Sequence, residues 1–181
     1  MSKSTVVTIF VLLGVFLLVG AYTYYTYSSA RLNEVDSEAS KTLDAGKSSP
    51  YTNMEGEPFS FDEYRGSIRV VNSWASWCPF CTKELLEFEK LGEEFKDKNV
   101  SIIAINRKEP RERANAYIKS LGDFKYIDFA VDLTDTYYKS IGGFAMPETV
   151  FYNTEGTIVY HKKGVMNLEQ MRAKLNELLK E

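Results

Sequence analysis

The two cysteines of this chain, Cys78 and Cys81, lie where one pattern of residues changes into another. Residues 68–74 favour a β-strand, and residues 81–96 carry apolar side chains at helical spacing. A strand that leads directly into a helix is the unit from which α/β folds are built. We therefore expect the pair at this junction, with Cys78 on the first turn of the helix. Cysteines so close together cannot join distant parts of a fold, so their role is predicted to be chemical.

The rest of the chain continues the alternation of strand and helix patterns. A capping pattern at residues 60–63 predicts a short helical turn, and the turn at residues 153–156 predicts an antiparallel hairpin. Further strands are predicted at residues 100–105, 126–131, 149–152 and 157–161, and further helices at residues 110–121, 134–141 and 167–179. This order predicts an α/β domain whose central mixed β-sheet has helices on both faces.

The N-terminal thirty residues have a different character. No residue from 4 to 30 is charged, and residues 6–21 are almost wholly apolar, followed by a run of tyrosines typical of a membrane interface. A helix needs roughly 20 residues to cross the hydrocarbon layer, so residues 5–25 predict one transmembrane helix. Lys3 precedes it, and the positive-inside rule then places the C-terminal domain outside the cytoplasm.

A cleaved signal peptide is the alternative for this segment, because Ser28-Ser29-Ala30 has the small residues of a cleavage site. The length of the apolar stretch favours an uncleaved signal-anchor over residues 1–30. Residues 31–50 are polar without an apolar period and predict a flexible linker. Residues 51–181 then form the folded domain.

Size and charge limit the function classes. The chain has 181 residues, enough for one domain with a core and a short appendage. Its net charge is -3, which gives no indication of a nucleic-acid partner.

The cysteine pair is expected to exchange disulfides. The N-terminus of a helix has free N–H groups and a partial positive charge, and both stabilise a thiolate. Cys78 is therefore the predicted attacking thiol. Cys81, one helical turn further in, is the predicted resolving thiol, which closes the ring and releases the partner.

Other uses of the pair fit less well. A structural zinc site needs four ligands, and His161 is the only additional nitrogen or sulfur ligand in the sequence. His161 also has no visible partner for acid–base chemistry. Haem attachment requires a histidine after Cys81, where the chain has Thr82. A structural disulfide remains an alternative, although so small a loop gains little unfolded-state entropy.

The motif around the cysteines is longer than CxxC. The run Trp74-Ala75-Ser76-Trp77-Cys78-Pro79-Phe80-Cys81 follows Val70-Val71-Asn72, and Gly56-Glu57-Pro58-Phe59 precedes both. From about residue 51 to the C-terminus, and in its N-terminal segment, the chain resembles the TlpA/ResA-like thioredoxin-fold oxidoreductases. The resemblance implies a thioredoxin-like fold with Cys78 as an exposed nucleophile, Cys81 as resolver and Trp77 as a wall beside the site. It implies a redox-active disulfide and no separate cofactor.

The resemblance also points to Met146 and Pro147 as residues that contact the substrate. In this family a cis proline before a strand lies against the disulfide, and Pro147 occupies that place; from the sequence alone it fits a strand-start proline equally well. Met146 stands where a β-branched residue is common, which affects how the partner's backbone docks. Pro79 and Phe80 lie between the cysteines and are expected to tune the reduction potential.

Glu109 follows the strand predicted at residues 100–105, where some family members carry a carboxylate below the cysteines. If its pKa is raised by burial, Glu109 accepts the proton of Cys81. The alternative is a solvated loop acid beside Lys108.

Together these features predict a membrane-anchored, extracytoplasmic thiol-disulfide oxidoreductase that reduces disulfides in partner proteins, for example in cytochrome c maturation. A membrane thiol electron donor would reduce it again. Two alternatives stay open. One is an oxidant that donates its disulfide to folding proteins, and the other is a tethered binding or chaperone-like module with a structural disulfide.

Overall fold

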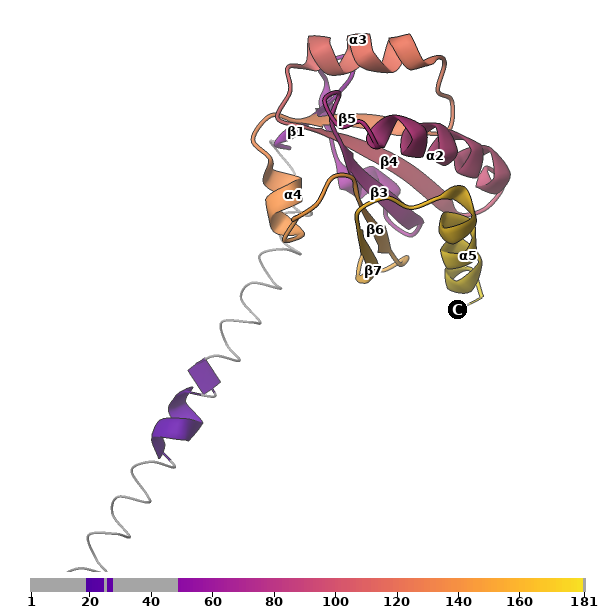
Figure 1. Ribbon diagram of the computed structural model, residues 1–181. Helices are drawn as coiled ribbons and strands as arrows, with labels where there is room; N and C mark the ends of the chain where they lie inside the picture. The colour runs from indigo at the N-terminus through magenta and orange to yellow at the C-terminus, as the bar shows by residue number, and fades with distance from the viewer. Residues whose placement is uncertain (1–18, 25, 28–48, 181) are drawn as a thin grey trace, which may run out of the picture. The chain divides into compact units, whose positions relative to one another are not determined.

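The protein is described by a computed structural model that covers residues 19–24, 26, 27 and 49–180 (Figure 1). The chain divides into two units, Met1–Thr42 and Leu43–Glu181, and each is treated by itself.

In the first unit the described residues are helical, and the Thr23 hydroxyl donates a hydrogen bond to the Gly20 carbonyl at 2.9 Å. Within the described parts of the chain, no helix combines the length and apolar character needed to span a membrane. Residues 5–18 and 25 of the predicted transmembrane segment, and residues 31–48 of the predicted linker, lie outside the described residues.

The second unit contains one seven-stranded sheet in the order β2-β1-β5-β4-β3-β6-β7. The strands are β1 (Tyr51–Asn53), β2 (Pro58–Phe59), β3 (Ile68–Trp74), β4 (Val100–Arg107), β5 (Asp128–Asp132), β6 (Glu148–Tyr152) and β7 (Ile158–Lys163). The helices are η1 (Phe61–Tyr64), α2 (Cys81–Phe95), α3 (Arg111–Leu121), α4 (Thr136–Ser140) and α5 (Leu168–Leu178). β3, β4 and β5 are parallel, because α2 and α3 connect them as crossovers, and the outer strands pair antiparallel.

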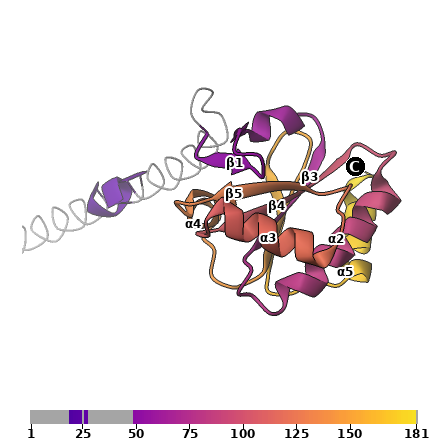
Figure 2. The same ribbon diagram turned by 90° about the horizontal axis from the view of Figure 1, so that it is seen from above.

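Helices cover both faces of the sheet, as Figures 1 and 2 show. Alternate residues of β3 face opposite sides: Val70 belongs to a core with residues of α2, α3 and α5, whereas Val71 belongs to a second core with residues of η1 and α4. Every residue of β3 is buried as a result. Burial on both faces explains why the central strands lack a regular alternation of apolar and polar residues.

The predicted mixed sheet with helices on both faces is confirmed, and the predicted elements from residue 60 onward are present with small shifts at their ends. The hairpin of β1 and β2 was not predicted. Its strands have only three and two residues, too short for a periodic pattern. Gly56 lies in the turn between them with φ of 93°, a conformation that glycine adopts readily.

The strand register brings three distant loops to one edge of the sheet. At this edge Trp74 of β3 pairs with Asn106 of β4, and Ser73 pairs with Glu148 of β6. The segments that follow β3, follow β4 and precede β6 therefore meet there. They carry the two cysteines, Glu109 and Pro147, respectively.

Candidate active site

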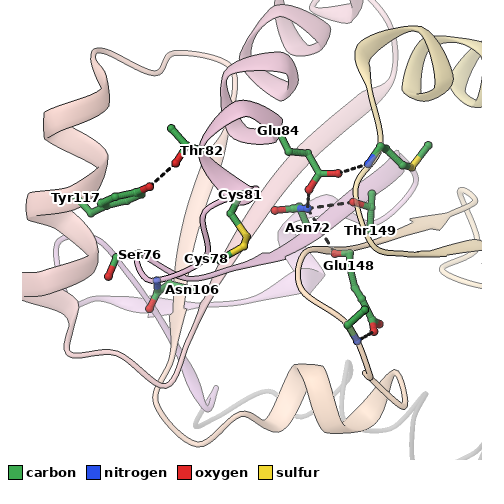
Figure 3. Close-up of a disulfide and its surroundings, with 12 residues drawn as sticks. Asn72, Ser76, Cys78, Cys81, Thr82, Glu84, Asn106, Tyr117, Glu148 and Thr149 are labelled. Atoms are coloured by element: carbon green, nitrogen blue, oxygen red, sulfur yellow. Dashed lines mark hydrogen bonds between the residues drawn. A yellow bond between two sulfur atoms is a disulfide. The ribbon is translucent and has the colours of Figure 1, made fainter.

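A disulfide joins Cys78 to Cys81, whose Cα atoms are 5.4 Å apart (Figure 3). α2 begins at Cys81, so the prediction that Cys78 lies on the first helical turn is wrong. Cys78 lies instead in the turn between β3 and α2. Its N–H donates to the Ala75 carbonyl at 3.1 Å, and its carbonyl accepts from the Cys81 N–H at 3.2 Å. The turn leads directly into α2, so both cysteines still lie at its N-terminal end.

The disulfide is buried, although the residues beside it are not. Cys78 is 2% exposed and Cys81 is 0% exposed. The implied exposed position of Cys78 is therefore wrong for the disulfide form, because Cys78 belongs to the same apolar core as Cys81. Trp77 is 57% exposed and Phe80 is 63% exposed, and Pro79 is exposed as well. The pair thus lies beneath an apolar surface to which Trp77 and the two residues between the cysteines contribute.

Met146 and Pro147 lie at the same edge of the sheet, before β6. The Met146–Pro147 peptide bond is cis, as the resemblance implies. The Pro147 carbonyl accepts a hydrogen bond from the Gly164 N–H at 2.9 Å, which ties this segment to the end of β7. Met146 packs against the core that contains both cysteines. The roles of these two residues in substrate contact stay predictions.

Glu109 is 3% exposed, so it is not a solvated loop acid. Its carboxylate accepts hydrogen bonds from the Ser76 N–H at 2.7 Å, the Ser76 hydroxyl at 2.5 Å and the Asn106 side-chain amide at 2.8 Å. Burial alone would raise the pKa of Glu109, but these hydrogen bonds and the nearby Arg113 guanidinium lower it. The raised pKa expected for Glu109 is therefore wrong, and the group fixes the loop before Cys78.

A different carboxyl has the expected property. Glu84, which the sequence analysis missed, is 0% exposed on α2, one turn after Cys81. Its two oxygens accept from the Met166 N–H at 2.7 Å and from the Asn72 side-chain amide at 2.9 Å. The Asn72 amide also donates to the Thr149 hydroxyl at 3.0 Å, and Figure 3 shows this network beside the disulfide. Burial raises the pKa of Glu84 to about 7, although its hydrogen bonds oppose the shift.

A sequence signal for Glu84 was available. Cys81, Glu84, Leu85 and Phe88 follow the spacing of one helix face, and all are buried. An acidic residue within an apolar stripe is rarely buried without partners. Its partners come from β3 and from the segment before α5, which no local pattern could identify.

No group of three or more His, Cys, Asp or Glu side chains is placed to hold a metal ion in the described part of the chain. The disulfide is the redox group that the residues of this site supply.

Comparisons with known proteins agree with this site. The Redoxin family profile matches residues 38–179. The thiol-disulfide oxidoreductase ResA of Halalkalibacterium halodurans is 34% identical over 129 residues, which are 70% of this chain and 70% of that protein. The thiol:disulfide interchange protein DsbE of Vibrio cholerae is 28% identical over 67% of this chain and 66% of that protein.

Solved structures show the same fold. The exposed lipoprotein thioredoxin Etrx1 of Streptococcus pneumoniae superposes with a TM-score of 0.60 and 24% identity, over 70% of this chain and 96% of that one. This likeness confirms the thioredoxin-like α/β fold. Together with the buried Cys78–Cys81 disulfide, the comparisons show that the chain belongs to the Redoxin family and is a thiol-disulfide oxidoreductase similar to ResA and DsbE.

Proposed function

We propose that this oxidoreductase works as a reductant of disulfides in partner proteins outside the cytoplasm, with apocytochrome c during cytochrome c maturation as the expected class of partner. The observation that supports the reducing direction is the burial of the Glu84 carboxyl close to the cysteine pair. This carboxyl lies one helical turn after Cys81.

The reaction consists of two exchanges. The Cys78 thiolate attacks one sulfur of a partner disulfide, so that a mixed disulfide forms and the partner's other sulfur leaves as a thiolate. The Cys81 thiolate then attacks the Cys78 sulfur. The partner leaves as a dithiol, and the Cys78–Cys81 disulfide seen here is restored. A membrane thiol donor supplies two electrons and returns the pair to the dithiol.

Glu84 favours the reducing direction for an electrostatic reason. A disulfide is strongly oxidising when its reduced form is stabilised, chiefly through the thiolate. An ionised carboxyl near the pair has the opposite effect, because it disfavours a second negative charge. With its pKa raised to about 7 by burial, Glu84 carries substantial charge at neutral pH. The reduced form is then less stable and the potential more negative.

The place of action rests on the N-terminal sequence. Its uncharged, apolar residues and Lys3 support a single anchor with the C-terminal domain extracytoplasmic. We propose residues 1–30 as the signal-anchor, residues 31–50 as the linker and residues 51–181 as the catalytic domain.

The reduction potential of the pair tests the direction. The purified full chain is equilibrated with thiol–disulfide buffers, and the dithiol fraction is measured after alkylation. We expect a value near roughly -270 mV, as in thioredoxin, with insulin reduction that disappears in Cys78→Ser. A value near roughly -120 mV would instead support the disulfide-donating oxidant. Unchanged function in cells after Cys78→Ser and Cys81→Ser would support the tethered binding module.

Glu84→Gln tests the electrostatic argument itself. Removing the charge is expected to shift the potential by about 30 mV toward less negative values, equivalent to about 1.4 kcal/mol. Glu93→Gln, exposed and further along α2, is the matched control and should leave the potential unchanged, because Glu93 does not contribute to the raised pKa of Glu84. A more negative potential in Glu84→Gln would contradict the argument.

A further inference from the structure

Glu148 is a buried carboxyl directly after the cis proline, with 0% exposure. Its Oε1 atom accepts hydrogen bonds from the N–H of Phe144, at 2.5 Å, and from the N–H of Ala145. The side chain therefore reaches back over Pro147 and fixes the backbone in front of it. Hydrogen bonds to a carboxylate are stronger than neutral ones, so this contact holds the segment firmly.

His161 of β7 occupies the other oxygen of Glu148. Its Nε2 atom lies 2.6 Å from Oε2, and because a carboxylate only accepts hydrogen bonds, the contact assigns the proton to Nε2. In the β6–β7 register Glu148 is opposite Lys163, so His161 is its diagonal neighbour on the same face. The sequence alone does not show this partner of His161, because Glu148 lies on a different strand.

Two further contacts hold the segment from other elements. The Tyr138 hydroxyl of α4 donates to the Ala145 carbonyl at 2.7 Å, and the Gly164 N–H donates to the Pro147 carbonyl at 2.9 Å. Among the described residues, the backbone N–H and C=O of Met146 have no hydrogen-bond partner, although the residues on both sides are bonded. The anchored segment thus presents the free N–H and C=O of one residue, Met146, beside Pro147.

We propose that Glu148, held in place by His161, is a positioning residue for partner docking. It fixes residues 144–147 so that the free N–H and C=O of Met146 pair with an extended segment of the partner chain, on the side of the site formed by Pro147. Main-chain pairing of this kind supplies affinity for a peptide of any sequence. The inference rests on disulfide exchange at Cys78 and deepens it, because it assigns substrate recognition to a carboxyl outside the redox pair.

Two matched disulfides test the proposal. A hexapeptide with a central cysteine linked to thionitrobenzoate offers a backbone, whereas N-acetylcysteine linked to the same group offers the same leaving group with almost none. The full chain carrying Cys81→Ser, with Cys78 reduced, is mixed with each. Release of thionitrobenzoate gives the rate constant of mixed-disulfide formation. This measurement does not depend on whether the natural pair is a reductant or an oxidant.

In this background we expect the peptide to react about tenfold faster than the small disulfide. Glu148→Ala should lower the peptide rate about tenfold and change the small-disulfide rate less than twofold, because the turn that holds Cys78 is untouched. Glu148→Gln keeps one acceptor oxygen and His161→Gln keeps a donor, so each should lower the peptide rate about threefold. Glu155→Gln, in the exposed turn between β6 and β7, is the control and should change neither rate.

Equal rates for the two disulfides in the Cys81→Ser chain without a further substitution would overturn the proposal. A Glu148→Ala variant that slows both reactions equally would also overturn it, because that result indicates a structural role. If Glu148→Ala does not fold, the milder His161→Gln decides: an unchanged peptide rate in that variant contradicts the positioning role. The reduction potential of the Cys78–Cys81 pair, measured separately in the unsubstituted chain, tests the proposed reducing function. A failure of that function is therefore distinguished from a failure of the docking proposal.

Discussion

Two buried glutamates of the site, Glu84 and Glu109, have pKa shifts of opposite sign, and the number of donors around each explains the difference. Glu84 accepts two hydrogen bonds, which do not outweigh its burial. Glu109 accepts three, and Arg113 lies 3.4 Å away, so its pKa is lowered. Glu84 lies on α2 with Cys81, whereas Glu109 follows β4, and their chemistry at neutral pH differs.

Glu84 is expected to make the stability of the domain depend on pH. The folded state raises its pKa from 4.5 to about 7, so it binds this proton more tightly than the unfolded state does. Stability therefore falls as pH rises from about 4.5 to about 7, by about 3 kcal/mol from this group. Urea unfolding at pH 5 and pH 8 should show the loss, and Glu84→Gln should abolish it. Equal pH dependence in both proteins would contradict the assigned pKa.

Glu109→Gln is expected to destabilise the oxidised domain at pH 7 by about 1–3 kcal/mol, because an amide cannot accept from all of the donors that surround this carboxylate. Since the pKa of Glu109 is lowered, its contribution is present above about pH 4.5 and is lost as pH falls through the folded-state pKa. Urea midpoints measure the effect. Ser76→Ala, which keeps the backbone N–H bond, should cost less; a larger cost for Ser76→Ala would refute this account of the loop.

The residues of the site differ in how far the sequence identifies them. Cys78 and Cys81 belong to one short motif, so the sequence identifies them directly, whereas Pro147 is identified only through the family resemblance. The position of Glu109 after a buried strand is compatible with burial, but the sign of its pKa shift depends on Ser76 and Asn106, whose side chains meet it only in the folded chain. Glu84 could have been identified from its place in the apolar stripe of α2, but its partners Asn72 and Met166 lie on other segments and no local pattern shows them.

At the scale of elements, the start of α5 is the clearest local signal that the structure confirms. The Asn167 side chain accepts from the Gln170 N–H at 2.9 Å, and the Gln170 side chain accepts from the Asn167 N–H at 3.1 Å. This reciprocal pair satisfies two N–H groups that would otherwise lack partners at the helix start.

Asn167→Ala should therefore lower the free energy of unfolding by about 1 kcal/mol. Asn176→Ala, on the exposed side of the same helix, is the matched control and should be neutral or slightly stabilising, because alanine has the highest helix propensity. Urea denaturation of the two variants gives the comparison. The capping role is refuted if both substitutions have the same effect.

The helical pattern predicted from residue 81 agrees with the start of α2, but the prediction that Cys78 lies on its first turn is wrong. Residues 75–80 contain Pro79, and the residue directly before α2, Phe80, provides no side-chain cap. The helix begins at Cys81, where the turn that ends in the Cys78–Cys81 backbone hydrogen bond is complete. Strand and helix types followed from local periodicity, whereas this boundary depends on how the chain leaves the end of β3.

At the scale of the whole molecule, the parallel arrangement of β3 and β4 and the antiparallel return of β6 create the site. They bring together loops that are about thirty to seventy residues apart in sequence, as expected where strand ends meet at one edge of a sheet. The order of strands and helices predicted the mixed sheet. It did not give the seven-strand order, because β1 and β2 are too short to recognise.

The proposed anchor gives a prediction for the 181-residue chain. Protein isolated from membranes should resist carbonate extraction and have the intact mass of all 181 residues, because an uncleaved helix holds it in the bilayer. A variant that lacks residues 1–30 should not sediment with membranes. A mature mass that lacks the first thirty residues would support the cleaved signal peptide instead.

The central claim is that Cys78 attacks a partner disulfide and Cys81 resolves the adduct. Intact-mass measurement of the full-length chain after reaction with a disulfide-linked protein substrate tests it most directly. The account predicts that Cys81→Ser accumulates a covalent adduct through Cys78, that Cys78→Ser accumulates none, and that the parent chain releases reduced substrate. An adduct that forms through Cys81 in Cys78→Ser at an equal rate, or no adduct in either variant, would contradict it.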